Sequence, residues 1–312
     1  MSREIGVVAR EAELDVALDL GEQALAHSEA SGTVVLVSAA VQAESLVLGA
    51  LQRVATLRER SPARFDLALS RRATTGTEAQ LSGSALYHAL ALPSVNALYP
   101  DASPRTLLNR NLRAFLNGYT AAGVPFRYFG TEVLSLLGHP VALVGYDQTA
   151  AGAVLIEVLV GLENPCVVRS AIARQPAASL WSILRQRSAP MDLLGRVTRG
   201  LIERLGATAT DLDSKLSPSA PRVPVSLASG SEIVPAQVAI PLGVVEASLA
   251  PEVQLGGDLL VSRAALTEVE KLVAAAAQAP FNEQVLAPLA GRALDGARPA
   301  DILGALRAAQ AA

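Results

Sequence analysis

Four apolar runs lie close together between Phe126 and Val160: FRYFG, EVLSLL, PVALVG and AVLIEVLV. Only short turn signals, such as Gly138-His139-Pro140 and Ala151-Gly152, separate some of them. Parallel strands need crossover connections of about a dozen residues or more, whereas tight turns can join antiparallel strands. The spacing therefore favours hairpins in a mixed or mostly antiparallel sheet over a Rossmann fold.

Amphipathic segments on both sides of these runs predict helices that flank the sheet. Residues 11–30 and 103–123 repeat apolar side chains at intervals of three and four, and Gly32 and Gly123 end the two patterns. Short β-rich runs at residues 33–38 and 45–51 predict two further strands, and residues 178–186 and 191–206 predict two further helices. The predicted fold class is α+β.

A boundary is predicted at residues 217–226, SPSAPRVPVS, where three prolines interrupt every hydrophobic period. It divides the chain into a large domain of residues 1–216, a linker of residues 217–226, and a small α+β accessory domain of residues 227–312. Within the accessory domain, residues 262–278 predict a helix.

Composition restricts the classes of partner. The net charge of -3, with both signs interspersed, argues against a nucleic-acid-binding surface, and no apolar run approaches the roughly 18 residues of a membrane span. The first residues, MSREIGVVAREAELD, lack the apolar core of a secretory signal, so we expect a cytoplasmic protein. Three scattered histidines and one cysteine give no metal-binding pattern.

The most informative segment for function is FDLALSRRATTGTEAQLSGSALYH, residues 65–88. Its first residues alternate as in a half-buried strand that delivers Arg71 and Arg72 to its end, beside a turn rich in Gly, Ser and Thr. Guanidinium groups and the backbone N–H groups of such a turn can together bind a carboxylate or a phosphate. A solvated strand end is the alternative reading of the two arginines.

The order of these features resembles the lipoate–protein ligase A family of the biotin/lipoate ligase superfamily. The matching segments are the helix LDVALDLGEQAL, the strand LVLGALQ, the pair Arg71-Arg72, and SGSALYH, residues 82–88. In the C-terminal part, Gly257-Asp258 before a helix resembles the accessory domain of the family.

The resemblance implies that lipoate or octanoate attacks the α-phosphate of ATP, with magnesium, and that the acyl group then passes to a lysine of a lipoyl carrier domain. The residues that it implies for substrate and nucleotide binding, with Arg127 as a further candidate cation, are Arg71, Arg72, Ser82, Gly83, Ser84, Tyr87, His88 and Arg127. It assigns no catalytic residue, because Pro140 stands where the family carries its lysine. Ser82-Gly83-Ser84 likewise replaces a three-glycine turn.

Two hypotheses follow, either an active ligase or acyltransferase, or a catalytically lapsed relative that acts as a ligand-binding or regulatory module. His88 fits a packing role as well as a binding role, and Cys166 fits packing better than a nucleophile. The carboxylates of Glu132, Asp147 and Glu157 could contact magnesium or ribose, although most such carboxylates are exposed.

Overall fold

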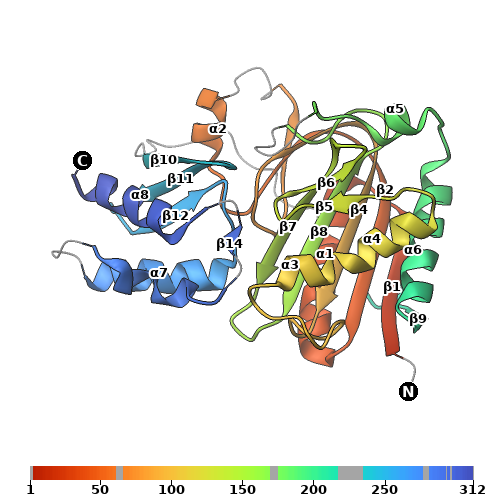
Figure 1. Ribbon diagram of the computed structural model, residues 1–312, viewed down its shortest axis with the longest axis horizontal. Helices are drawn as coiled ribbons and strands as arrows, with labels where there is room; N and C mark the ends of the chain where they lie inside the picture. Colours follow the sequence, from red (N-terminus) through yellow and green to blue (C-terminus); the bar gives the residue numbers. More distant parts are fainter. Residues whose placement is uncertain are drawn as a thin grey trace.

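The computed structural model describes residues 3–60, 66–168, 175–216, 235–276, 281–292, 294–295 and 297–311. Residues 3–216 are called the N-terminal part below and residues 235–311 the C-terminal part (Figure 1). The predicted linker, residues 217–226, lies outside the described residues, so the division into domains stays a prediction.

A nine-stranded sheet forms the centre of the N-terminal part, in the order β5-β6-β7-β8-β4-β2-β1-β9, with β3 also paired to β2. Its strands are β1 (Arg3–Glu11), β2 (Val34–Leu48), β3 (Ala68–Arg71), β4 (Ala79–Leu92), β5 (Arg127–Tyr128), β6 (Val133–Leu136), β7 (His139–Gln148), β8 (Val154–Gly161) and β9 (Ala207–Asp211). The pairs β1–β2, β1–β9 and β2–β3 are parallel, and the other pairs are antiparallel. The predicted α+β fold with a mixed, mostly antiparallel sheet is therefore confirmed.

Helices cover both faces of this sheet, because the central strands carry apolar side chains on both sides. The helices of the N-terminal part are α1 (Leu14–Ser31), α2 (Val54–Arg60), α3 (Leu107–Asn111), α4 (Arg113–Ala121), α5 (Leu180–Leu184) and α6 (Pro190–Arg204). In β4, Tyr87 and Ala89 face the cluster under α1, whereas Leu86 and Leu90 face the cluster under α4 and α6. The even-numbered positions of β4 therefore share the face of α6.

The C-terminal part holds a second, smaller sheet with helices. Its elements are β10 (Ala236–Ile240), β11 (Gly243–Ser248), β12 (Gln254–Gly257), β13 (Leu260–Val261), α7 (Arg263–Ala275), the 3-10 helix η2 (Glu283–Leu289), β14 (Leu294–Asp295) and α8 (Pro299–Ala311). It is held to the N-terminal part by buried hydrogen bonds: Gln52 Nε2 donates to Asp258 Oδ1 at 2.6 Å, and the Thr75 hydroxyl donates to the Val261 carbonyl at 2.8 Å. The two parts also share one hydrophobic cluster.

Several predicted boundaries were wrong. The predicted strands at residues 33–38 and 45–51 are one strand, β2, because the polar residues between them still pair with β4. The predicted helix at residues 103–123 is two helices, α3 and α4, which begin after Thr106 and Leu112. The strand predicted before the arginines is only Ala68–Arg71, so Arg71 lies inside it; Phe65 lies outside the described residues.

Two further observations concern the described residues as a whole. None of their helices is long and apolar enough to cross a membrane. Nor do three or more of their His, Cys, Asp or Glu side chains gather as a metal-binding group.

Candidate functional site

Arg71 is held by backbone carbonyls. Its Nη1 donates to the carbonyl oxygens of Gly49 at 2.8 Å, Ala50 at 3.3 Å and Gln52 at 2.7 Å, all in the turn that follows β2. Partial burial lowers the pKa of the guanidinium. Through these hydrogen bonds Arg71 holds the turn after β2 in place.

Arg72 lies inside the protein, with 1% of its surface exposed. Its Nη2 donates to the carbonyls of Thr75 at 3.1 Å and Thr77 at 2.9 Å, so the loop after β3 wraps around the guanidinium. Burial lowers the pKa of Arg72, and the nearby Glu157 opposes this shift. Nε and Nη1 of Arg72 have no hydrogen-bond partner among the described residues.

Glu157 of β8 is the acid beside this cation. It is fully buried and accepts hydrogen bonds from the Thr74 backbone N–H at 3.0 Å, the Thr74 hydroxyl at 2.5 Å and the Tyr87 hydroxyl at 2.6 Å. The expectation that Glu132, Asp147 and Glu157 are exposed was therefore wrong. Each of the three is at most 4% exposed: Asp147 and Glu157 lie in the buried strands β7 and β8, and Glu132 lies just before β6.

The predicted turn at Ser82-Gly83-Ser84 is part of the paired strand β4, so that prediction was wrong. The three residues pair with Glu44, Ala43 and Gln42 of β2, and the Ser82 and Ser84 hydroxyls donate to the Glu44 and Gln42 side chains. Glycine is required at position 83, because its φ is +86° and a Cβ atom would lie 2.6 Å from Glu163 Oε2.

Tyr87 and His88 continue the same strand, as predicted, and both are buried. His88 Nδ1 lies 2.9 Å from the Ser38 hydroxyl and Nε2 lies 2.8 Å from the Tyr119 hydroxyl. Burial lowers the pKa of His88 to about 3, so the ring stays neutral. These contacts support the packing role of His88, in which it joins β4 to β2 and α4.

Two other predicted positions lie toward the edge of the sheet. Arg127 is exposed on the edge strand β5. Pro140 is buried at the start of β7, opposite Ser135, next to a register shift in β6 that accommodates a residue without a backbone N–H. Its carbonyl accepts a hydrogen bond from Ala178 N at 3.0 Å.

Cys166 is buried below the sheet and acts as a packing residue. Its Sγ donates to the carbonyl of Val141 at 3.2 Å, and burial raises its pKa to about 12. Because the thiolate is the nucleophilic form of cysteine, a thiol with this pKa cannot form a thioester efficiently near neutral pH.

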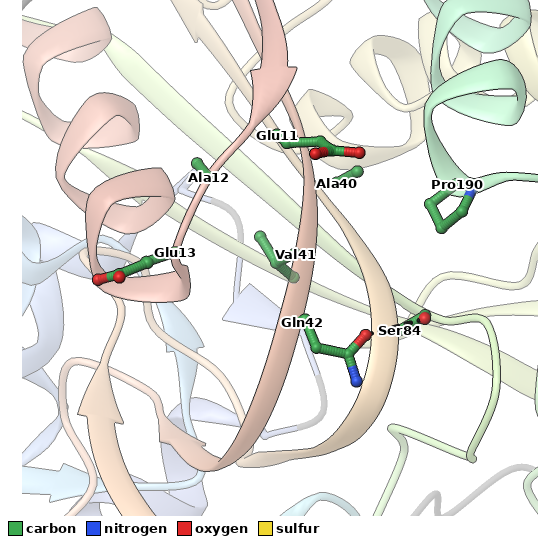
Figure 2. Close-up of a pocket in the computed structure, with 8 residues that line it drawn as sticks. All are labelled: Glu11, Ala12, Glu13, Ala40, Val41, Gln42, Ser84 and Pro190. Atoms are coloured by element: carbon green, nitrogen blue, oxygen red, sulfur yellow. Dashed lines mark hydrogen bonds between the residues drawn. The ribbon is translucent and has the colours of Figure 1, made fainter.

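Ser84 lines a cavity of about 440 Å³ between the end of β1, the middle of β2 and β4, and the start of α6 (Figure 2). The described residues that line it are Glu11, Ala12, Glu13, Ala40, Val41, Gln42, Ser84 and Pro190. Figure 2 shows the Glu11 carboxylate beside Ala40 and the Gln42 amide turned toward Ser84, whereas the Glu13 carboxylate points away. Among these described residues, the charged side chains are the two carboxylates of Glu11 and Glu13.

The sequence pattern did not predict which residues line this cavity. Only Ser84 belongs to the predicted set, whereas Gln42 reaches the cavity through its strand register with Ser84 and Pro190 through the packing of α6. Of the predicted cations, neither Arg71 nor Arg72 contributes to it. The structure thus separates the predicted arginines from the cavity beside the predicted Ser82-Gly83-Ser84 segment.

The architecture described above defines a fold of the lipoate–protein ligase type, as comparison with solved structures shows. The chain matches a lipoate–protein ligase A bound with ATP with a TM-score of 0.51 and 14% identity, over 69% of this chain and 92% of that one. It matches a T. acidophilum protein regarded as a lipoate protein ligase, with bound lipoic acid, with a TM-score of 0.50 and 12% identity, over 68% and 89% of the two chains. No protein-family model and no curated protein sequence matches. The family resemblance seen in the sequence is confirmed for the fold.

Proposed function

We propose that this chain uses the lipoate-ligase fold to bind the acyl-accepting lysine of a lipoyl-type carrier domain, free or acylated, without activating an acyl acid with ATP. The observation that carries the proposal is the chemistry of the cavity beside Ser84. Its walls are apolar at Ala12, Ala40, Val41 and Pro190, its polar groups are Gln42 and Ser84, and its charges are acidic. A lysine ammonium or a neutral acyl-lysine amide matches such a lining.

ATP does not fit the predicted binding residues that the structure describes. Phosphates need cations or free N–H donors, and a magnesium ion needs carboxylates that can reach it. Arg71 is engaged with three carbonyls, Arg72 is enclosed by its own loop, and Pro140 supplies neither charge nor N–H. The buried carboxylate of Glu157 already accepts three hydrogen bonds. The proposal therefore includes no adenylation step.

The fold supports the carrier as partner, because it is the fold of a lipoate–protein ligase, and the family that the sequence resembles is expected to pass its acyl group to a carrier lysine. In this chain the cavity lies at a sheet surface where a protein loop can enter, since Glu11, Glu13 and Gln42 are exposed. The cavity would then hold the aliphatic stem against Ala40, with the ammonium near Glu11, which is the strand partner of Ala40.

One observation supports a second candidate, an ATP-dependent ligase for lipoate or octanoate. Nε and Nη1 of Arg72 lack partners, and buried guanidinium N–H groups without partners are costly. A carboxylate or phosphate that reached them would relieve that cost.

The proposal is tested by titrating a lipoyl carrier domain into the protein, once with its lysine free and once with the lysine octanoylated, using calorimetry. We expect saturable binding of both forms. Glu11→Gln should weaken binding of the free-lysine form about two- to fivefold, as for a partly exposed ion pair, and leave the octanoylated form unchanged. Glu203→Gln, an exposed glutamate of α6 away from the cavity, is the matched control. Absence of binding by both carrier forms would reject the proposal.

A further inference from the structure

A second cavity, of about 600 Å³, lies between the C-terminal part and the loop that precedes α3. Its walls come from η2, the residues around β14, and the first turn of α8, together with Arg105 of the N-terminal part. Figure 1 shows α3 on the side of the main sheet that faces the C-terminal part. A volume of this size lies within the range of about 300–1,000 Å³ that is usual for small-molecule sites.

The cavity is cationic at its mouth, unlike the cavity beside Ser84. Three arginines from three separate segments line it: Arg105, Arg292 and Arg298. Arg292 donates to Gln148 Oε1 at 2.9 Å, and Arg298 pairs with Asp301 at 2.9 Å. No hydrogen bond or ion pair of Arg105 is found within the described part of the chain, which leaves a whole guanidinium available.

Acidic groups do not cancel this charge. Among the lining residues whose side chains the structure describes, Glu283 is the only one with a carboxylate, and Asp301 pairs with Arg298. Among these described side chains, three arginines against two carboxylates leave one net positive charge, in a chain whose overall net charge is -3. Complementarity of charge therefore selects an anion at this position.

The floor of the cavity is apolar. Leu286, Leu289 and Leu303 are buried side chains that line it, and Leu294 and Ala297 add to the same surface. An apolar floor below a cationic mouth suits an amphipathic ligand, since the tail leaves water while the head group keeps its charge beside guanidinium groups. A small inorganic anion would leave the floor unused.

We propose that this cavity binds a medium-chain fatty carboxylate, with the carboxylate at Arg105 and Arg292 and the alkyl chain against Leu286, Leu289 and Leu303. The site goes beyond the carrier-binding function proposed above, because it is a separate cavity and involves no residue of that cavity. Since its wall combines the N-terminal part with the C-terminal part, a bound acid would link the two parts.

The test is calorimetric titration of the full chain with octanoate, 1-octanol and acetate. Octanoate should bind saturably with one site, whereas octanol, which lacks the charge, and acetate, which lacks the tail, should bind at least about fivefold more weakly. Arg105→Gln should weaken octanoate binding by about fivefold or more. Arg105 is exposed and makes no internal contact that this change would break.

A second variant and a control variant distinguish a loss of octanoate binding from a loss of folding. Ala287→Glu places a carboxylate on an exposed position of the cavity wall and should also weaken octanoate binding. Arg113→Gln changes an exposed arginine of α4 outside the cavity and should bind octanoate like the unmodified chain. The proposal is overturned if octanoate shows no saturable binding, if octanol binds as tightly as octanoate, or if Arg105→Gln and Ala287→Glu leave its affinity unchanged.

Discussion

Gly145 of β7 lies directly against the guanidinium of Arg72: a Cβ atom at position 145 would be 2.9 Å from Arg72 Cζ. The strand thus closes over the cation, and the loop carbonyls of Thr75 and Thr77 enclose it from the other direction. The arginine that the sequence assigns to ligand binding is, by this geometry, a buried counter-charge for Glu157. Its removal should therefore affect folding before it affects any ligand.

Arg72→Met should destabilise the protein by about 3–5 kcal/mol, because it removes the buried hydrogen bonds to the Thr75 and Thr77 carbonyls and the positive charge near the buried Glu157. Urea unfolding followed by circular dichroism measures the effect. Arg113→Met, at an exposed arginine, should change the free energy of unfolding by no more than about 0.5 kcal/mol. An Arg72→Met protein that is as stable as the unmodified chain but has lost a ligand would instead indicate a binding role.

Gly145→Ala should destabilise the protein by about 1–3 kcal/mol or more, since the added methyl group overlaps the Thr74 hydroxyl and the Thr75 carbonyl. Gly195→Ala is the matched change in α6, where a Cβ atom meets nothing within 4 Å. It should stabilise the protein by about 0.5–1 kcal/mol through helix propensity. Equal effects of the two substitutions would show that β7 does not pack on Arg72 as described.

His88 should make stability depend on pH. Its pKa is about 3 in the folded protein and about 6.5 when unfolded, so the unfolded state binds the proton more tightly. The contribution of the neutral His88 ring to the free energy of unfolding is fully present above about pH 6.5. As the pH falls below this value, the contribution decreases by about 1.4 kcal/mol per pH unit until about pH 3. Between pH 7 and pH 5, the free energy of unfolding measured in urea should fall by about 2 kcal/mol less in His88→Gln than in the unmodified chain. The same loss in both proteins would mean that the ring is solvated.

Cys166 should resist alkylation in the folded protein. With a pKa of about 12 and no exposed sulfur, it offers almost no thiolate at pH 8. Mass spectrometry after iodoacetamide treatment should find Cys166 unmodified in buffer and fully modified in urea. Rapid modification in buffer would restore the nucleophile hypothesis.

The fold was largely predictable because its signals are local. The close spacing of the runs after Phe126 predicted the hairpins β6–β7 and β7–β8, and the apolar period of residues 11–30 predicted α1. The first strand was missed because REIGVVARE carries charges at both ends and pairs only with the distant strands β2 and β9. Parallel pairing with strands that are distant in the sequence leaves no recognisable pattern in the residues of the first strand.

The site was less predictable because its contacts join distant segments. Glycine and serine at positions 82–84 resemble a turn, yet their partners on β2 lie about 40 positions earlier and keep them in a strand. The acceptors of Arg71 lie about 20 positions before it, in a turn with no recognisable motif. An arginine pair in a sequence shows that positive charge is present, but not whether backbone carbonyls already occupy it.

The central claim is that the two arginines are structural and that the chain does not activate acyl acids. Its most direct test is ATP–pyrophosphate exchange with magnesium and either lipoate or octanoate. The account predicts no exchange above that seen with ATP alone, for the unmodified chain and for a folded Arg72→Lys variant alike. Saturable exchange with either acid that disappears in Arg72→Lys, while the variant keeps its circular dichroism spectrum, would contradict it and establish the ligase.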